Sequence, residues 1–281
     1  MPLLTLFRSD FEMFKYPAGE LQVRCKSITH NSDRVLLYTT SRDIVEIGLC
    51  ISAIQARKRP QQRVSLCLPY LPFSRADRRF VPGDCHGLDM FASYLSTLGI
   101  HHVYTVDVHS RFAKQFIPNL VNLSPVSLVD AAQKQFSTKV KESVNILVPD
   151  AGAKERYRGV PLQASKIRDP ATGKLSGFET PSKEELGGQP TLIIDDICDG
   201  GGTFVGLAEQ LKAKGVSRLG LYVTHGIFSN GLTKLLQFFD HVYTTDSCNV
   251  YDRDYQAYSN CVTVFSMRDF CLKKIEKGEY E

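Results

Sequence analysis

Two adjacent carboxylates followed by a glycine-rich turn indicate chemistry more clearly than any other part of this chain. Asp195 and Asp196 end a short apolar run that predicts a buried strand, and a buried carboxylate is costly unless something binds it. Asp199, three glycines and Thr203 follow, and the next apolar-periodic stretch predicts a helix that begins at the threonine. Backbone N–H groups can converge at glycines, and a helix start adds its positive dipole end, so the turn suits phosphate. The carboxylates suit sugar hydroxyls or a magnesium ion. The alternative is a tight turn whose aspartates are only caps.

An arginine-rich segment, PYLPFSRADRRFVPGD at 69–84, holds a second group of candidates. It leaves a predicted strand and places Arg75, Asp77, Arg78 and Arg79 within five consecutive positions. Arginines clustered at a strand exit suit bidentate binding of phosphate, whereas a solvated loop more usually mixes in lysine and serine. We therefore favour polyphosphate binding over a solvated loop.

Asp107 and His109 lie in a third segment, TVDVHSRF at 105–112. Positions two apart on a strand point the same way, so both side chains are expected on one face of a predicted strand. A histidine beside a carboxylate at a strand end suits a metal or a nucleotide as well as a structural role.

Lys166 and Arg168 belong to KIRDPATGKLSGFE at 166–179, where proline and glycines predict a mobile loop. Such a loop could close on a transferring phosphoryl group and neutralise charge as it develops. Taken alone, the segment is better explained as an ordinary surface loop.

Strand and helix patterns alternate from residue 34 onward, which predicts an α/β fold with mostly parallel sheets and helices on both faces. In such folds ligands bind at the carboxyl ends of the strands, where the candidate residues stand. The pattern indicates two similar domains, 1–125 and 126–266, with the C-terminal helix 267–281 packing back on the first. Strands are predicted at 34–40, 64–70, 101–109, 145–150, 191–196, 219–225, 241–246 and 262–265, and helices at 43–56, 88–98, 129–136, 204–214, 232–239 and 267–277.

Composition bounds the class of protein. The chain has 281 residues, of which 43% are apolar, enough for sizeable cores. Its net charge of +4 is not gathered into basic runs, so no nucleic-acid partner is expected. The first 15 residues lack a signal-peptide pattern, and no apolar stretch approaches the roughly 20 residues of a membrane helix. We therefore expect a cytoplasmic protein without a membrane partner. The eight cysteines form no CxxC pair and are interpreted as reduced core residues.

Together these segments resemble the ribose-phosphate pyrophosphokinases, also called phosphoribosyl pyrophosphate synthetases. The similarity covers about residues 16 to 265 and follows that family's order of motifs. The resemblance implies two type I phosphoribosyltransferase-like domains, the first on the ATP side and the second on the ribose-phosphate side. It also implies a magnesium-dependent transfer of the β,γ-diphosphate of ATP to the C1 hydroxyl of a ribose 5-phosphate group, with release of AMP. The matching motifs are YPAGE (16–20), PYLPFSRADRRFVPGD (69–84), TVDVHS (105–110), VPDAGA (148–153), the K-x-R of 166–168, LIIDDICDGGGT (192–203) and THGIFS (224–229).

Site residues carried over from the resemblance fall into two groups. On the ATP side, His109 and Asp150 would hold the magnesium ion on ATP. Tyr16 and Glu20 would reach adenine from a neighbouring subunit, because in this family the ATP site lies at a subunit interface; this implies a homo-oligomer. Contacts to the nucleotide would come from Arg75, Asp77 and His109.

On the transfer and acceptor side, Lys166 and Arg168 would stabilise the transition state. The ribose and its 5-phosphate would be held by Asp195, Asp196, Asp199, Gly200, Gly201, Gly202 and Thr203. The physics agrees, since phosphoryl-type transfer needs positioning and charge neutralisation more than covalent chemistry.

Departures from the family pattern raise alternatives for the acceptor. Gly200 stands where the family's loop D-T-G-G-T has its first threonine, which predicts a roomier pocket around the 5-phosphate. This favours an extended acceptor, ADP-ribose, giving ADP-ribose pyrophosphate as in NAD salvage; the alternative is ribose 5-phosphate, giving phosphoribosyl pyrophosphate. Adenine contacts are also altered, because YPAGE replaces F-x-D-G-E and Ala76 replaces a glutamine. A non-catalytic regulatory homologue is disfavoured because the catalytic and metal candidates all remain: Lys166, Arg168, His109 and Asp150. A phosphoribosyltransferase that consumes the sugar diphosphate explains only the 192–203 segment.

Overall fold

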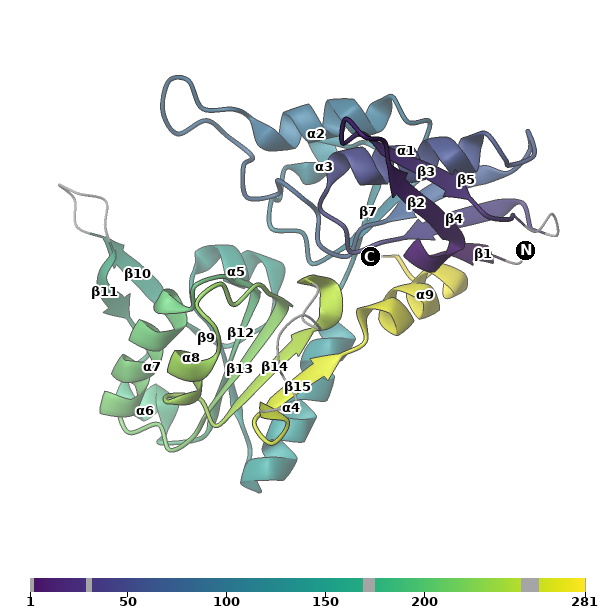
Figure 1. The fold of residues 1–281 in the computed structure, drawn as a ribbon. Helices are drawn as coiled ribbons and strands as arrows, with labels where there is room; N and C mark the ends of the chain where they lie inside the picture. Colours follow the sequence, from purple (N-terminus) through teal and green to yellow (C-terminus); the bar gives the residue numbers. More distant parts are fainter. Residues whose placement is uncertain (1–2, 29–31, 169–174, 249–257, 281) are drawn as a thin grey trace. The chain divides into compact units, whose positions relative to one another are not determined.

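The protein divides into two compact units that are described separately. The computed structural model describes residues 3–28, 32–168, 175–248 and 258–280 (Figure 1). One unit comprises Met1–Ser124 with Met267–Glu281, and the other comprises Pro125–Ser266.

The first unit is built on a five-stranded sheet whose neighbouring strands all run parallel, in the order β1-β4-β5-β6-β7. Its helix α1 begins where the Asp43 side chain accepts hydrogen bonds from the N–H groups of Val45 and Glu46. The main core lies between the sheet and helices α1 and α2, with Ile51 and Phe91 fully buried. The elements are β1 (Leu3–Leu6), β4 (Arg34–Tyr38), β5 (Arg63–Cys67), β6 (Val103–Val106), β7 (Leu120–Leu123), α1 (Ile44–Gln55), α2 (Gly87–Ser96), α3 (Ala113–Phe116) and α9 (Met267–Lys277).

The C-terminal helix α9 is part of this first unit. Arg268 at its start lies over the ring of Phe7, with 5.7 Å between the guanidinium carbon and the ring centroid. Tyr280, after its end, packs on Tyr104 of β6 with ring centroids 5.6 Å apart. These two contacts attach the end of the chain to Phe7 and to β6 of the first unit.

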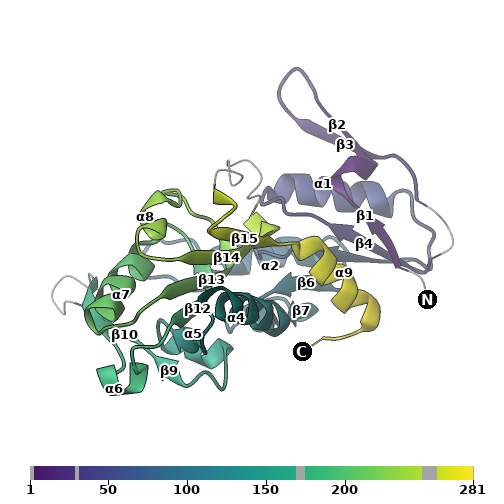
Figure 2. The ribbon, with the colours of Figure 1, turned by 90° about the horizontal axis from the view of Figure 1, so that it is seen from below.

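A β-hairpin of β2 (Phe11–Lys15) and β3 (Leu21–Cys25) extends away from the sheet of the first unit (Figure 2). In its turn the N–H of Tyr16 donates to the carbonyl of Glu20 at 2.9 Å. Gly19 has φ of +98°, a conformation that favours glycine.

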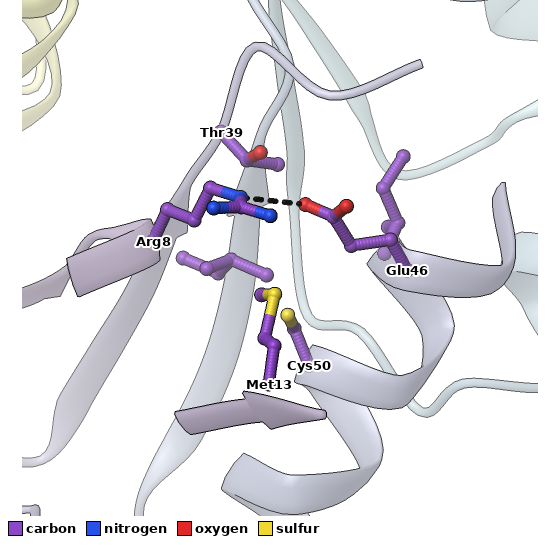
Figure 3. Close-up of a pocket in the computed structure, with 7 residues that line it drawn as sticks. Arg8, Met13, Thr39, Glu46 and Cys50 are labelled. Carbon is purple, nitrogen blue, oxygen red and sulfur yellow. Dashed lines mark hydrogen bonds and ion pairs between the residues drawn. The ribbon is translucent and has the colours of Figure 1, made fainter. Parts of the chain in front are cut away.

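A small cavity lies at the base of this hairpin, between the 3₁₀ helix η1 (Arg8–Asp10), β2, β4 and α1 (Figure 3). It is bordered by the ion pair of Arg8 and Glu46, whose Nε and Oε1 are 3.4 Å apart, and by Met13 and Cys50. Its volume of about 10 Å³ is near the minimum for one water molecule. None of the predicted site residues lines it, so we assign it a packing role.

The second unit is built on a six-stranded parallel sheet in the order β15-β14-β13-β12-β8-β9. Successive residues of β12 alternate between two cores: Ile193 packs with α7 and α8, whereas Leu192 and Ile194 pack with α4 and α5. Helices therefore cover both faces of this sheet (Figure 1). The elements are β8 (Asn145–Val148), β9 (Leu162–Gln163), β12 (Thr191–Cys198), β13 (Leu219–Gly226), β14 (His241–Thr245), β15 (Val262–Phe265), α4 (Val126–Val140), α5 (Ala151–Arg156), α6 (Lys183–Leu186), α7 (Gly202–Ala213) and α8 (Thr233–Leu236).

The predicted α/β class with mostly parallel sheets is confirmed, and several elements were missed. Strands β1, β7 and β9 are only two to four residues long, and the β2–β3 hairpin was overlooked although β3 (LQVRC) alternates apolar and polar residues. The loop predicted at 166–179 is wrong at both ends, because β10 (Ser165–Arg168) and β11 (Leu175–Glu179) form an antiparallel pair. Residues 169–174 of that segment lie outside the described residues.

All eight cysteines are free thiols. Cys85 is exposed and Cys261 is half-buried, and the other six are buried. In the described parts of the chain, no helix combines the length and apolar character needed to cross a membrane.

Candidate active site

The predicted carboxylate pair lies near the carboxyl end of β12, which continues to Cys198 beyond the predicted end of the strand. Asp195 and Asp196 are only 8% and 2% exposed. Arg156, at the end of α5, donates from Nη2 to Oδ1 of Asp195 at 3.0 Å and to Oδ1 of Asp196 at 2.7 Å. Burial, followed by the neighbouring Asp196, raises the pKa of Asp195 well above its usual range, and Arg156 opposes that rise. Each buried carboxylate thus has a cationic partner.

Arg156 was not among the site residues predicted from the sequence. The available signal was its position: it lies in the segment after Asp150, just past the VPDAGA motif. Local spacing could not show that its guanidinium reaches two aspartates about 40 positions further along the chain.

The glycine-rich turn follows the pair directly and leads into α7. The helix begins at Gly202 rather than at Thr203 as predicted, because Gly201 takes the capping position with φ of +80°. A Cβ atom at Gly201 would lie 3.2 Å from Cγ of Leu235, so the turn excludes a side chain there. A Cβ atom at Gly202 would have no other atom within 4 Å. The N–H groups at the start of α7 remain the natural partners of a phosphate.

Gly200 does not leave the open space that its small size predicted. A Cβ atom there would lie 2.8 Å from Nδ2 of Asn230. That amide donates to the carbonyl of Gly200 at 3.3 Å. Asn230, which follows the THGIFS motif, therefore takes the room that the missing threonine side chain would release.

Asp150, the predicted magnesium ligand, stands after β8 and caps α5. Its Oδ1 accepts from the N–H of Ala153 at 3.0 Å, and its Oδ2 accepts from Nζ of Lys166 at 2.8 Å. Burial by itself raises the pKa of Asp150, but the hydrogen bonds from Lys166 and Ala153 outweigh it and hold the pKa below its usual value. Lys166 lies in β10 beside Arg168, whose side chain lies outside what the structure describes.

The short helix α5 thus links Asp150 to the carboxylate pair of Asp195 and Asp196. Asp150 caps the start of α5, Arg156 ends it, and β8 and β12 are adjacent parallel strands. The charge of Asp150 also contributes to the raised pKa of Asp195, which shows that the two lie within electrostatic range. The second unit therefore brings together Asp150, Lys166, Asp195, Asp196 and the turn at 199–203.

In the first unit, Asp77 has two partners. Its Oδ2 accepts from Oγ of Ser110 at 2.8 Å and its Oδ1 from Nε of Arg78 at 2.9 Å. Burial raises the pKa of Asp77, but Arg78, Ser110 and the nearby His109 together lower it. His109 thus lies within electrostatic range of Asp77, and Arg75 lies exposed in the same loop as Asp77.

The prediction that Asp107 and His109 share a strand face is wrong. Strand β6 ends at Val106, and Asp107 takes a left-handed conformation with φ of +49°. The alternation of a strand ends there, so Asp107 is 3% exposed while His109 is exposed.

Tyr16 and Glu20 lie in the turn of the β2–β3 hairpin and are exposed; Tyr16 is 48% exposed and packs edge-on against Phe14, with centroids 5.5 Å apart. Both are accessible to another molecule. The sharing of one magnesium ion by His109 and Asp150 stays a prediction, because the two residues belong to different units.

Magnesium is usually bound by one or two carboxylates together with substrate phosphates. The residues present suit that arrangement: Asp150 turns Oδ2 towards a cation, here the ammonium of Lys166. Within residues 3–28, 32–168, 175–248 and 258–280, no group of three or more histidine, cysteine, aspartate or glutamate side chains is placed to hold a metal by itself.

Carboxylates and cations lie at the strand ends of both parallel sheets. The second unit adds a glycine-rich turn that suits phosphate. These features are typical of an enzyme that transfers phosphate groups. The chain belongs to the ribose-phosphate pyrophosphokinase family, whose members are diphosphokinases. It is 30% identical over 234 residues to the ribose-phosphate pyrophosphokinase of Thermococcus kodakarensis, covering 79% of each chain. The Pyrococcus furiosus protein of the same name is 26% identical over 238 residues, covering 81% of this chain and 82% of the relative.

A solved structure of phosphoribosylpyrophosphate synthetase from Mycobacterium smegmatis has the same fold. It matches with a TM-score of 0.78 over 98% of both chains at 18% sequence identity. No protein-family model matches the sequence.

Proposed function

We propose that this protein transfers the β,γ-diphosphate of ATP to the C1 hydroxyl of ribose 5-phosphate, producing phosphoribosyl pyrophosphate and AMP. The observation behind this choice of acceptor is Asn230, whose exposed side-chain amide lies in the space beside Gly200. The names of the relatives support the same acceptor. The sequence alone favoured ADP-ribose because it predicted a roomier pocket at Gly200. Asn230 lies in that space, so this reason for favouring ADP-ribose no longer holds.

The acceptor is proposed to bind in the second unit. Asp195 and Asp196 would accept hydrogen bonds from the ribose hydroxyls, and the backbone N–H groups of the turn at 199–203 would hold the 5-phosphate. This arrangement leaves C1 and its hydroxyl for the transfer. In the reaction the C1 oxygen forms a bond to the β-phosphorus of ATP while the bond from that phosphorus to the α-phosphate oxygen breaks.

Lys166 and Arg168 are proposed to neutralise the negative charge that develops on the transferring group. Asp150 and His109 would hold the magnesium ion, which supplies charge neutralisation on the phosphates when bound. Lys166 is within hydrogen-bond distance of Asp150, so the proposed catalytic cation and the proposed metal ligand are neighbours in the second unit.

ATP is proposed to bind to Arg75, Asp77 and His109 of the first unit. The exposed Tyr16 and Glu20 of the hairpin would reach the adenine bound to a neighbouring copy, which makes the active form a homo-oligomer. The hairpin supports this proposal because it extends away from the five-stranded sheet of the first unit (Figure 2). Tyr16 and Glu20 in its turn are both exposed.

A side-by-side assay tests the acceptor. The protein is given ATP and magnesium with ribose 5-phosphate or with ADP-ribose, and AMP and the new diphosphate are followed by chromatography and phosphorus NMR. We expect turnover with ribose 5-phosphate. Turnover mainly with ADP-ribose would overturn the proposed acceptor, and silence with both would overturn the proposed activity.

The variant Asn230→Ala tests whether Asn230 selects the acceptor. Removal of the amide opens the space beside Gly200, so any use of ADP-ribose should rise relative to wild type. Asn260→Ala, an exposed asparagine elsewhere in the same unit, is the matched control and should not change the ratio of the two acceptors. An unchanged ratio in Asn230→Ala would show that Asn230 does not select the acceptor.

A further inference from the structure

We propose that Arg156 is a positioning residue that holds Asp195 and Asp196 in the arrangement that receives the ribose hydroxyls. The inference rests on the proposed function for the identity of the acceptor. The geometry of the arginine and its two carboxylates is independent of that function.

A single nitrogen makes both contacts. Nη2 of Arg156 lies 3.0 Å from Oδ1 of Asp195 and 2.7 Å from Oδ1 of Asp196. Oδ1 of Asp195 also accepts from the N–H of Asp196 at 2.9 Å. The contacts therefore hold Oδ1 of Asp195 between two protein donors, Nη2 of Arg156 and the N–H of Asp196.

The pair needs such an anchor because of where it stands. Neighbouring residues of a strand normally point to opposite faces of the sheet, yet one guanidinium nitrogen contacts both aspartates. The side chains of Arg156, Asp195 and Asp196 are 20%, 11% and 3% exposed, so water screens these contacts little. Like charges this close repel each other strongly when buried, and the arginine offsets that repulsion.

Arg156 is itself firmly placed. It ends a six-residue helix, α5, whose first turn is capped by Asp150 and whose Ala153 is completely buried in the core against β12 and β8. The position of its guanidinium is therefore coupled to Asp150 and, through it, to Lys166. A displaced arginine would change the acceptor site without touching the ATP residues of the first unit.

Steady-state kinetics test this role in the full-length protein. In Arg156→Leu, we expect the KM for ribose 5-phosphate to rise by at least about tenfold, the loss typical of a charge-assisted hydrogen bond, while the KM for ATP stays unchanged. Arg156→Lys keeps the charge and should recover part of the loss. Arg158→Leu removes an exposed arginine two positions further on and should behave as wild type. An unchanged KM for ribose 5-phosphate, or equal increases for both substrates, would overturn the proposal.

Thermal unfolding gives a readout that does not depend on the substrate. Arg156→Leu leaves two buried carboxylates without their cation, so its Tm should fall by about 5 °C or more. Adding Asp195→Asn replaces one of the two acidic groups by a neutral amide and should restore much of that loss. If Arg156→Leu cannot be isolated folded, Arg156→Lys with and without Asp195→Asn replaces it. A Tm equal to that of Arg158→Leu would overturn the proposal.

The kinetic and thermal-unfolding experiments distinguish a failure of this inference from a failure of the proposed function. If wild type does not turn over ribose 5-phosphate, the proposed acceptor fails. The pattern of Tm values would then still support or reject the pairing of Arg156 with Asp195 and Asp196.

Discussion

Lys166 donates a hydrogen bond to Asp150 across 2.8 Å, between Nζ and Oδ2, and so places an ammonium where the proposed magnesium ion would bind. The lysine and the metal would therefore compete for one carboxylate oxygen. In Lys166→Met we expect turnover to fall by about 10²–10³-fold, because a cation on the transferring group is lost. We also expect magnesium to bind more tightly, because its competitor is gone. Steady-state kinetics and calorimetric titration with magnesium measure the two effects.

Lys183→Met, at the exposed start of α6, is the matched control and should change neither quantity. Unchanged turnover in Lys166→Met would remove Lys166 from the mechanism. Unchanged magnesium affinity would show that Asp150 is not the metal ligand.

Gly201 and Gly202 provide a matched pair of substitutions in the phosphate turn. Gly201→Ala places a methyl group 3.2 Å from Leu235 in a backbone conformation with φ of +80°. It should lower the free energy of unfolding by about 1–3 kcal/mol and raise the KM for ribose 5-phosphate. Gly202→Ala meets nothing within 4 Å and should be neutral to stability. Urea unfolding compares the two variants, and equal effects would contradict the assigned geometry of the turn.

Ser110 orients Asp77 in the proposed nucleotide site. Its hydroxyl donates to Oδ2 of Asp77 at 2.8 Å, and the residue is 2% exposed. In Ser110→Ala we expect the KM for ATP to rise by roughly fivefold, the loss of one hydrogen bond, with the KM for ribose 5-phosphate unchanged. A rise confined to ribose 5-phosphate would place Asp77 outside the nucleotide site.

His241 should make stability depend on pH in the second unit. Burial, followed by the neighbouring Lys139, lowers its pKa to about 4 from the usual 6.5, and Lys139 Nζ lies 2.8 Å from Nδ1. The folded state holds fewer protons on this residue than the unfolded state, so protonation favours unfolding. The contribution is therefore complete above about pH 6.5 and is lost as the pH falls towards 4.

The corresponding loss in the free energy of unfolding is roughly 3 kcal/mol. Chemical unfolding of wild type and His241→Gln at several pH values measures it as the difference between the two curves. Curves that run parallel across this pH range would contradict the lowered pKa.

The sequence by itself determined the class of fold and the family. Alternating strand and helix patterns are local and repeated, so they predicted the parallel sheets, and helix α9 was predicted with the bounds 267–277 that the structure has. The motifs also identified Asp150, Asp195 and Asp196 as candidates, because several carboxylates at strand ends are rarely found without a ligand.

Only the tertiary structure decided which side chains meet. Arg156 contacts Asp195 across 39 positions of sequence, and Asn230 reaches Gly200 across 30. No local spacing encodes such pairs, because they depend on how the strands and helices pack. The left-handed conformation of Asp107 ended a strand where residue alternation predicted that it continued. Periodicity specifies the elements, whereas the directions of the side chains at their ends follow from packing between distant segments.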